Sequence, residues 1–333
     1  VAPGLVDTHI HPTIGDFATK QQAVGFLERM VHGGVTRAMS AGEVHVPGRT
    51  GAESALAIAS GAFHSYRAYR PFGMKVHGGA MLFEKDTDFD HIDRAYDTGM
   101  RIIGEIGIGS LKDPKRSGEL SEYARSRGMT VHMHCGCTSD RGPGGEEHPH
   151  FSAEDVLVAK PSIASHANTF ASLSDEDIDL LCGAEGPPFV EVVQAGGTGS
   201  MLRVVERLAE KDALDRLLIG TDTPTGFGVT SLGVLKTVAD ICSLGDIVPE
   251  LCWAIASGQG ARAFGTEGNR VAEGMPADLV VMDASLGSRE DDASAALAAG
   301  EWPGIALVIA DGQIRVHGSL CTLRARRVPA VAA

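Results

Sequence analysis

Eight short apolar segments alternate with segments of helical period along this 333-residue chain, and this alternation constrains its fold more than any other feature. Short apolar runs separated by helices are typical of parallel strands that are buried on both faces. Between them, apolar residues recur at helical spacing, as at Leu202, Val205 and Leu208, and Ser174 followed by Asp177 is typical of a helix start. The eight expected strands cover residues 5–11, 34–41, 73–79, 101–106, 129–135, 162–167, 189–194 and 216–221. The pattern predicts an α/β fold, specifically a (β/α)8 TIM-like barrel.

The chain changes character after residue 265. Residues 268–282 and 305–316 contain strand-like runs, and the second stretch is centred on the turn Asp311-Gly312. Residues 288–300 are rich in alanine and acidic residues, as expected of a surface helix. We therefore expect two domains, a barrel over residues 1–265 and part of a small β domain over residues 266–333.

Composition narrows the class of protein. The 43 acidic residues outnumber the 29 basic residues and give a formal net charge of −14, which argues against nucleic acid and anionic membranes as partners. No apolar run approaches the roughly 18 residues needed to span a bilayer, and the first residues lack the pattern of a signal peptide. Six scattered cysteines favour reduced thiols. We expect a cytoplasmic protein that acts on a small molecule.

The first expected strand ends in a His-x-His pair. Because alternate side chains of a strand point to the same face, His9 and His11 project together and can bind one metal ion. Active sites of (β/α)8 barrels lie at the carboxyl ends of the strands. Four further ligand-capable residues close the fourth, fifth, sixth and eighth expected strands, namely Glu105, His134, His166 and Asp222.

Six such groups suffice for two metal ions, whereas one ion would use three or four of them. A carboxylate such as Glu105 can bridge two cations, and metal binding lowers the pKa of water from about 15.7 toward 7. Asp222 can serve both as a ligand and as a proton shuttle. The sequence thus predicts a hydrolytic two-metal centre, with a bridging hydroxide as nucleophile.

These motifs together resemble the amidohydrolase superfamily of metal-dependent barrel hydrolases. The resemblance rests on Pro-Gly-Leu-Val-Asp-Thr-His-Ile-His at residues 3–11, on the strand-end ligands, and on Gly-Met-Pro-Ala-Asp-Leu-Val at residues 274–280. Many binuclear members bridge their metals with a carboxylated lysine, where this chain has Glu105. That glutamate, with residues 75–80, is most similar to the enamidases, cyclic amidohydrolases that open the lactam ring of a tetrahydro-6-oxonicotinate.

The resemblance implies several further properties. The metal ligands would be His9, His11, Glu105, His134, His166 and Asp222. They would hold two divalent ions, zinc foremost, with iron or manganese as alternatives and a mixed zinc and iron centre as in enamidases. The protein would be a homo-oligomer, a tetramer by resemblance. The superfamily builds its β-sandwich from strands before and after the barrel, so we expect the N-terminal part of that sandwich to be missing before Val1.

A carboxylate on the substrate ring calls for a cation near the metals. Arg49, which follows the second expected strand, could bind the carboxylate in a bidentate manner, and Lys75 and His77 near the end of the third strand are rival candidates. His132 is interpreted as a neighbour of the metal site and not as a ligand. The loop at residues 144–150, which contains His148 and His150, is expected to form a rim of the active site.

Other activities stay open on the sequence alone. Within the superfamily the chain could be an imidazolonepropionase, a hydantoinase or dihydroorotase-like enzyme, an isoaspartyl dipeptidase or a deaminase. A metal-free structural or assembly relic of the fold is the alternative from another class of protein.

Overall fold

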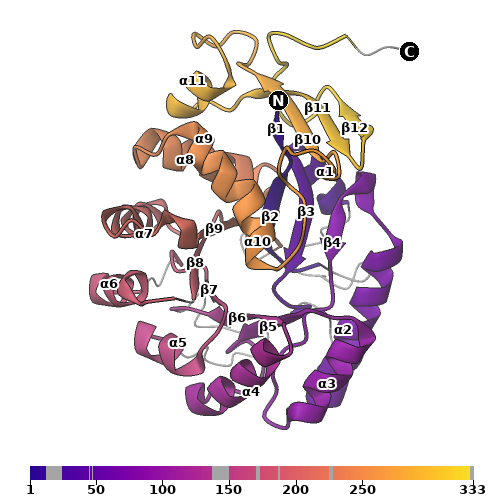
Figure 1. Cartoon of the computed structure of the whole chain (residues 1–333), viewed down its shortest axis with the longest axis vertical. Coiled ribbons are helices and arrows are strands. Elements are labelled where there is room, and N and C mark those ends of the chain that lie inside the picture. The colour runs from indigo at the N-terminus through magenta and orange to yellow at the C-terminus, as the bar shows by residue number, and fades with distance from the viewer. Residues whose placement is uncertain are drawn as a thin grey trace.

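The computed structural model describes residues 1–12, 25–44, 46, 48–136, 150–169, 173–186, 188–224 and 228–330. Strands and helices alternate along most of this length, and the helices lie around the outside of the strands (Figure 1). The barrel strands are β2 (Leu5–Ile10), β3 (Val35–Ser40), β4 (Lys75–His77), β5 (Ile102–Ile106), β6 (Thr130–His134), β7 (Ile163–Ser165), β8 (Phe189–Val193) and β9 (Leu217–Gly220). Each lies within one of the eight predicted ranges, so the predicted α/β barrel is confirmed.

The helices of the barrel have varied lengths, and several begin with the predicted side-chain caps. Ser174, for example, accepts a hydrogen bond from the backbone N–H of Asp177 at the start of α6. The helices are α1 (Phe26–His32), α2 (Ala52–Ala68), α3 (Phe89–Thr98), α4 (Pro114–Ser126), α5 (Ala153–Ala159), α6 (Asp175–Gly183), α7 (Thr198–Glu210), α8 (Gly233–Leu244), α9 (Pro249–Ala254) and α10 (Gly260–Ala263). Two 3-10 turns, Pro71–Gly73 and Leu214–Arg216, and a π turn, Ile255–Gln259, complete them.

The barrel wall consists of two parallel sheets. One has the order β2-β3-β4 and the other the order β5-β6-β7-β8-β9. Among the described residues, the sheets are joined by isolated bridges between Met81 and Ile103 and between Ile10 and Thr223. Backbone hydrogen bonds, such as that from the N–H of His11 to the carbonyl oxygen of Thr223 and that from the N–H of Glu105 to the carbonyl oxygen of Ala41, also cross the two junctions.

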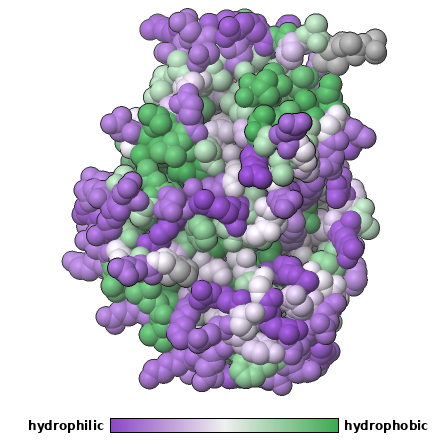
Figure 2. All heavy atoms as spheres, in the orientation of Figure 1, coloured by the Kyte–Doolittle hydropathy of each residue, from purple (hydrophilic) through white to green (hydrophobic). Residues whose placement is uncertain are grey.

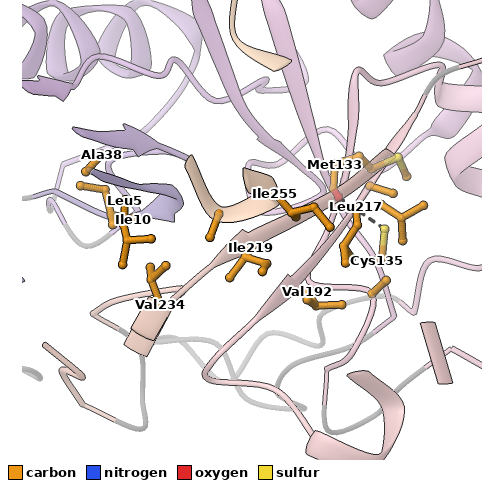
Figure 3. Packing of buried hydrophobic residues seen from close by; sticks show 14 of the residues in the cluster. Leu5, Ile10, Ala38, Met133, Cys135, Val192, Leu217, Ile219, Val234 and Ile255 are labelled. Carbon is orange, nitrogen blue, oxygen red and sulfur yellow. Dashed lines mark hydrogen bonds between the residues drawn. The ribbon is translucent and has the colours of Figure 1, made fainter. Parts of the chain in front are cut away.

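Most buried apolar side chains lie between the strands and the helices. Figure 3 shows Ile10 of β2, Ile219 of β9 and Val234 of α8 within this cluster. A smaller cluster fills the amino end of the barrel, where Val6 and Leu218, near the starts of their strands, pack with Phe264 just after α10. Because that end is filled by side chains, the opposite, carboxyl end is left for polar groups.

A four-stranded antiparallel sheet lies beside the barrel, in the order β1-β10-β11-β12. Asp311 and Gly312 have positive φ values of 50° and 73° and form the predicted turn between its last two strands. The edge strand comes from the N-terminus of the chain, so residues from both ends share this sheet (Figure 1). The strands are β1 (Ala2–Pro3), β10 (Leu279–Asp283), β11 (Gly304–Ala310) and β12 (Gln313–His317), with helix α11 (Ala293–Ala298) between β10 and β11.

The surface is mostly hydrophilic in the view of Figure 2, with apolar patches over α8 and α9 and over the four-stranded sheet. Leu244, Val248 and Leu251 are exposed where α8 leads into α9. The five cysteines that the structure describes are free thiols. None of the helices in the described ranges has the length and apolar character that crossing a bilayer requires.

Candidate metal centre

The His-x-His pair lies at the carboxyl end of β2 and is held by one ring nitrogen of each imidazole. Nδ1 of His9 lies 2.7 Å from Oε2 of Glu191, and Nδ1 of His11 lies 2.9 Å from the carbonyl oxygen of Gly42. Because these contacts occupy both Nδ1 atoms, both Nε2 atoms are left for the centre of the barrel. Nε2 of His9 lies 3.6 Å from carboxylate oxygens of Glu105 and of Asp222.

Glu105 lies between two groups of histidines. Its Oε2 atom faces the first strand, 3.6 Å from Nε2 of His9 and 3.7 Å from Nε2 of His11. Its Oε1 atom faces the other way, 2.5 Å from Nε2 of His166 and 3.6 Å from Nδ1 of His134. One carboxylate that contacts two separate histidine groups has the geometry expected of a bridge between two cations.

The residues fit two divalent metal ions. Potential ligand atoms of His9, His11 and Glu105 lie within 4.8 Å of one another, and the same holds for Glu105, His134 and His166. Nε2 of His9, which faces Glu105 and Asp222, is buried and has no hydrogen-bond partner among the described residues, which would be costly without a cation to coordinate it. Imidazole and carboxylate ligands suit zinc, iron and manganese.

Two members of this cluster have unusual backbone conformations. His166 follows β7 and Asp222 lies two residues after β9. Their φ values are 38° and 58°, in the left-handed region that residues other than glycine seldom adopt. The backbone N–H of Asp222 donates to the carbonyl oxygen of His9 over 2.9 Å, which holds the eighth strand end against the first. Strain of this kind is typical of functional sites, where surrounding contacts enforce it.

The charges of the cluster stabilise its carboxylates. Burial alone would raise the pKa of Asp222, but positive charge on His9 and contacts with His11 lower it to about 2. Burial also opposes ionisation of Glu105, yet the positive imidazoles of His166 and His9 hold its pKa well below the usual range. Burial lowers the pKa of His134 to about 4, which keeps that ring neutral near pH 7, as a metal ligand must be.

Sequence reasoning missed the residue that orients His9. Glu191 of β8 is fully buried, accepts a 2.5 Å hydrogen bond from Oγ1 of Thr8 and contacts His9 through its other oxygen. His132 belongs to the same cluster of potential ligand atoms. A carboxylate that binds the outer nitrogen of a metal-binding histidine fixes its tautomer. One feature of the sequence could have indicated this role: Glu191 is the single charged residue in the otherwise apolar strand Phe-Val-Glu-Val-Val.

We predict that Glu191→Gln weakens metal binding about 10-fold to 100-fold, because an amide is a poorer partner for the imidazole N–H of His9 than a carboxylate is. Metal retained after dialysis against graded chelator concentrations measures this effect. Glu119→Gln, an equivalent change on the exposed side of α4, is the control. Equal metal retention in both variants would show that Glu191 does not support His9.

Sequence reasoning also missed Asp7, a buried carboxylate that connects two strands of the barrel. Asp7 accepts hydrogen bonds from the N–H of Thr221 over 3.0 Å and from its Oγ1 over 2.6 Å. Burial raises the pKa of Asp7 to about 7 in spite of these bonds. Since Asp7 lies on β2 and Thr221 follows β9, the pair links the first and last strands of the barrel.

The proposed substrate cations have different positions. Arg49 lies in the segment between β3 and α2, and its Nε atom lies 2.7 Å from Oε1 of Glu84. Lys75 and His77 are the first and last residues of β4, and the contacts that the structure gives for them are with residues outside the metal cluster. Nζ of Lys75 lies 2.6 Å from Oδ2 of Asp278. Asp278 directly precedes β10 of the four-stranded sheet.

His77 makes its contact with Arg37 of β3, over 2.9 Å, and not with the cluster. The predicted rim loop lies outside the described residues except for His150, which is exposed.

The comparisons with known proteins agree with this geometry. The Amidohydrolase family model matches residues 1–315. Enamidase of Eubacterium barkeri is 39% identical over 330 residues, which are 98% of this chain and 84% of that protein. The crystal structure of an enamidase superposes with a TM-score of 0.92 at 38% identity, covering 98% of this chain and 84% of that one. A prolidase-like structure from Bifidobacterium longum, at 17% identity, 98% and 82% coverage and a TM-score of 0.63, shares the fold.

Proposed function

Because this chain belongs to the amidohydrolase family, we propose that it hydrolyses the C–N bond of a cyclic amide, a lactam, in the manner of an enamidase. The observation that carries the proposal is the position of Glu105, which contacts both histidine groups where many relatives would use a carboxylated lysine. The identity of 39% to enamidase over nearly the whole chain supports the same reaction class. The ring of the substrate would carry a carboxylate, as in tetrahydro-6-oxonicotinate.

Each residue of the cluster has a part in this reaction. His9 and His11, and His134 and His166, would hold the divalent cations together with Glu105. When bound, the cations supply activation of water and polarisation of the amide oxygen. Oδ1 of Asp222 lies 3.1 Å from Nε2 of His11, so this carboxylate is placed to take a proton from the attacking water and return it to the leaving ring nitrogen.

Arg49 is the candidate for binding the substrate carboxylate. It follows β3, and its Nε atom pairs with Glu84, so a substrate carboxylate would bind through the other guanidinium nitrogens.

Turnover of a small panel of compounds tests the proposal. The panel holds carboxylated lactams, unsubstituted lactams, hydantoins, isoaspartyl dipeptides and an imidazolone, with metal content measured by mass spectrometry on the same sample. We expect the carboxylated lactams to give the highest kcat/KM and metal content near two equivalents per chain. Preference for hydantoin, dipeptide or imidazolone would replace the proposal with that activity, and less than one equivalent of metal would favour the metal-free alternative.

We also propose the metal identity, the cellular location and the oligomeric state that the resemblance implies. The cations would be zinc, with iron or manganese as alternatives or as one member of a mixed pair. The protein would act in the cytoplasm as a homo-oligomer, a tetramer by resemblance, and the exposed apolar side chains of Leu244, Val248 and Leu251 are suited to a subunit contact. The domain division at residues 265 and 266 stays a proposal.

A further inference from the structure

A cavity lies at the gap between β4 and β5, and none of the residues that line it belongs to the metal cluster. Its volume is about 310 Å³, and residues of β3, α2 and β4 and the start of β5 line it. No aspartate or glutamate is among its described lining residues. Five cationic side chains face it, namely Arg37, Arg67, Arg70, Lys75 and Arg101, together with His77. We call it the cationic cavity.

The charge of Arg37 is buried without direct neutralisation. The side chain is 5% exposed. Its guanidinium donates to Oδ1 of Asn269 over 2.8 Å and to the carbonyl oxygen of Glu267 over 2.9 Å, and it contacts Nε2 of His77 over 2.9 Å. All three partners are neutral groups, since burial and the nearby positive charges lower the pKa of His77 to about 3. The carboxylates that favour its ionisation, Asp278 and Asp311, act from beyond hydrogen-bond distance.

Two acidic residues contact other cations of the cavity. Asp311 pairs with both Arg70 and Lys75 over 2.7 Å, and Asp278 pairs with Lys75 over 2.6 Å. These pairs account for the charges of Arg70 and Lys75.

Arg67 and Arg101 resemble Arg37 in lacking an acidic partner among the described residues. The guanidinium of Arg67 lies 5.8 Å from the ring centre of Phe63. Arg101 donates to the carbonyl oxygens of Tyr96 and Met100 and stacks 3.9 Å from the ring centre of Tyr96. Five cationic residues thus surround one cavity against the two carboxylates of Asp278 and Asp311, in a chain whose formal net charge is −14.

We propose that the cationic cavity binds a small multivalent anion, of the class of phosphate or a short dicarboxylate. Guanidinium groups bind planar or tetrahedral oxyanions through pairs of parallel hydrogen bonds. A volume of about 310 Å³ holds such an ion with bridging water but excludes a large ligand.

The bound anion would link the two sheets of the barrel wall. Arg37 and Lys75 belong to the β2-β3-β4 sheet, and Arg101 directly precedes β5 of the other sheet. On this side the described residues join the sheets through the bridge between Met81 and Ile103 and through a hydrogen bond from the N–H of Glu105 to the carbonyl oxygen of Ala41. An anion held from both sides would therefore stabilise the folded barrel.

Thermal unfolding with and without anion tests the inference. We expect phosphate or glutarate, at a hundredfold excess over its Kd, to raise the Tm of the wild-type protein by roughly 3–5 °C relative to sodium chloride of equal ionic strength. Isothermal titration calorimetry would measure binding directly. A response to phosphate alone would assign the site to phosphate, and a response to glutarate alone to dicarboxylates.

A double variant separates the cationic cavity from anion binding at the metals. Arg67→Gln with Arg101→Gln changes two exposed side chains and should weaken the cavity binding at least tenfold, while any binding to the metal centre remains. Arg94→Gln, an exposed arginine of α3 that pairs with Glu53, is the matched control and should bind as the wild type does. Unchanged binding in the double variant, equal losses in the control, or no binding beyond that of chloride would overturn the proposal.

Discussion

Asp222→Asn is expected to lower kcat by about 10²-fold to 10⁴-fold, the range that a general acid or base contributes. Asparagine has the size of aspartate and can keep an oxygen near His11, so the cluster should keep its shape and its metals. It cannot accept and return a proton near pH 7. The loss should therefore appear in kcat, with little change in metal content measured by mass spectrometry on the same preparation.

With a pKa of about 2, the carboxylate of Asp222 is ionised throughout the neutral range. The substitution therefore removes a group that is charged and unprotonated before the reaction. Asp215→Asn, which changes an exposed aspartate in the turn before β9, is the matched control. If Asp222→Asn kept a near-normal kcat with both metals bound, another group would have to move the proton.

Glu105→Gln is expected to have the second large effect, on metal binding itself. The carboxylate contacts His9 and His11 through one oxygen and His134 and His166 through the other, so an amide in its place offers one good ligand atom where two are needed. Losing an outer partner of a metal site costs up to about 100-fold in affinity or activity, and losing a bridging ligand should cost at least as much. Metal content should fall below two equivalents per chain.

This prediction requires that the variant be folded, since Glu105 is buried. Circular dichroism and the Tm of the metal-free proteins should match those of the wild type within a few degrees. Glu122→Gln on α4, where the glutamate pairs with Lys160 at the surface, is the control for the charge change. Two tightly held metals in Glu105→Gln would exclude a bridging role and would weaken the case for an enamidase-like centre.

The pattern of the chain was enough to predict the barrel and the six side chains that meet in it. A period of two residues puts His9 and His11 on one face, and the ends of parallel strands converge at one end of a barrel whatever their separation in sequence. Both rules are local or topological, so Glu105, His166 and Asp222 could be expected together before any coordinates.

The surroundings of Lys75 and His77 did not follow from their segment alone. Residues 75–77 pair with β3, with Lys75 opposite Arg37. Lys75 and His77 are two residues apart and share one face of β4, and their contacts are with Asp278 and Arg37 beside the cationic cavity. Which face of a short strand meets which neighbours depends on contacts with other elements, which a single segment does not encode by itself.

For this protein, sequence by itself determined the fold class, the ligand types and the end of the barrel where they gather, because these follow from side-chain period and strand order. Only the tertiary structure decided that Glu191 orients His9, that Asp7 joins the first and last strands, and that Arg37, Arg67 and Arg101 surround one cavity. Each of these arrangements joins residues far apart in the chain, and the packing of whole strands and helices sets such distances.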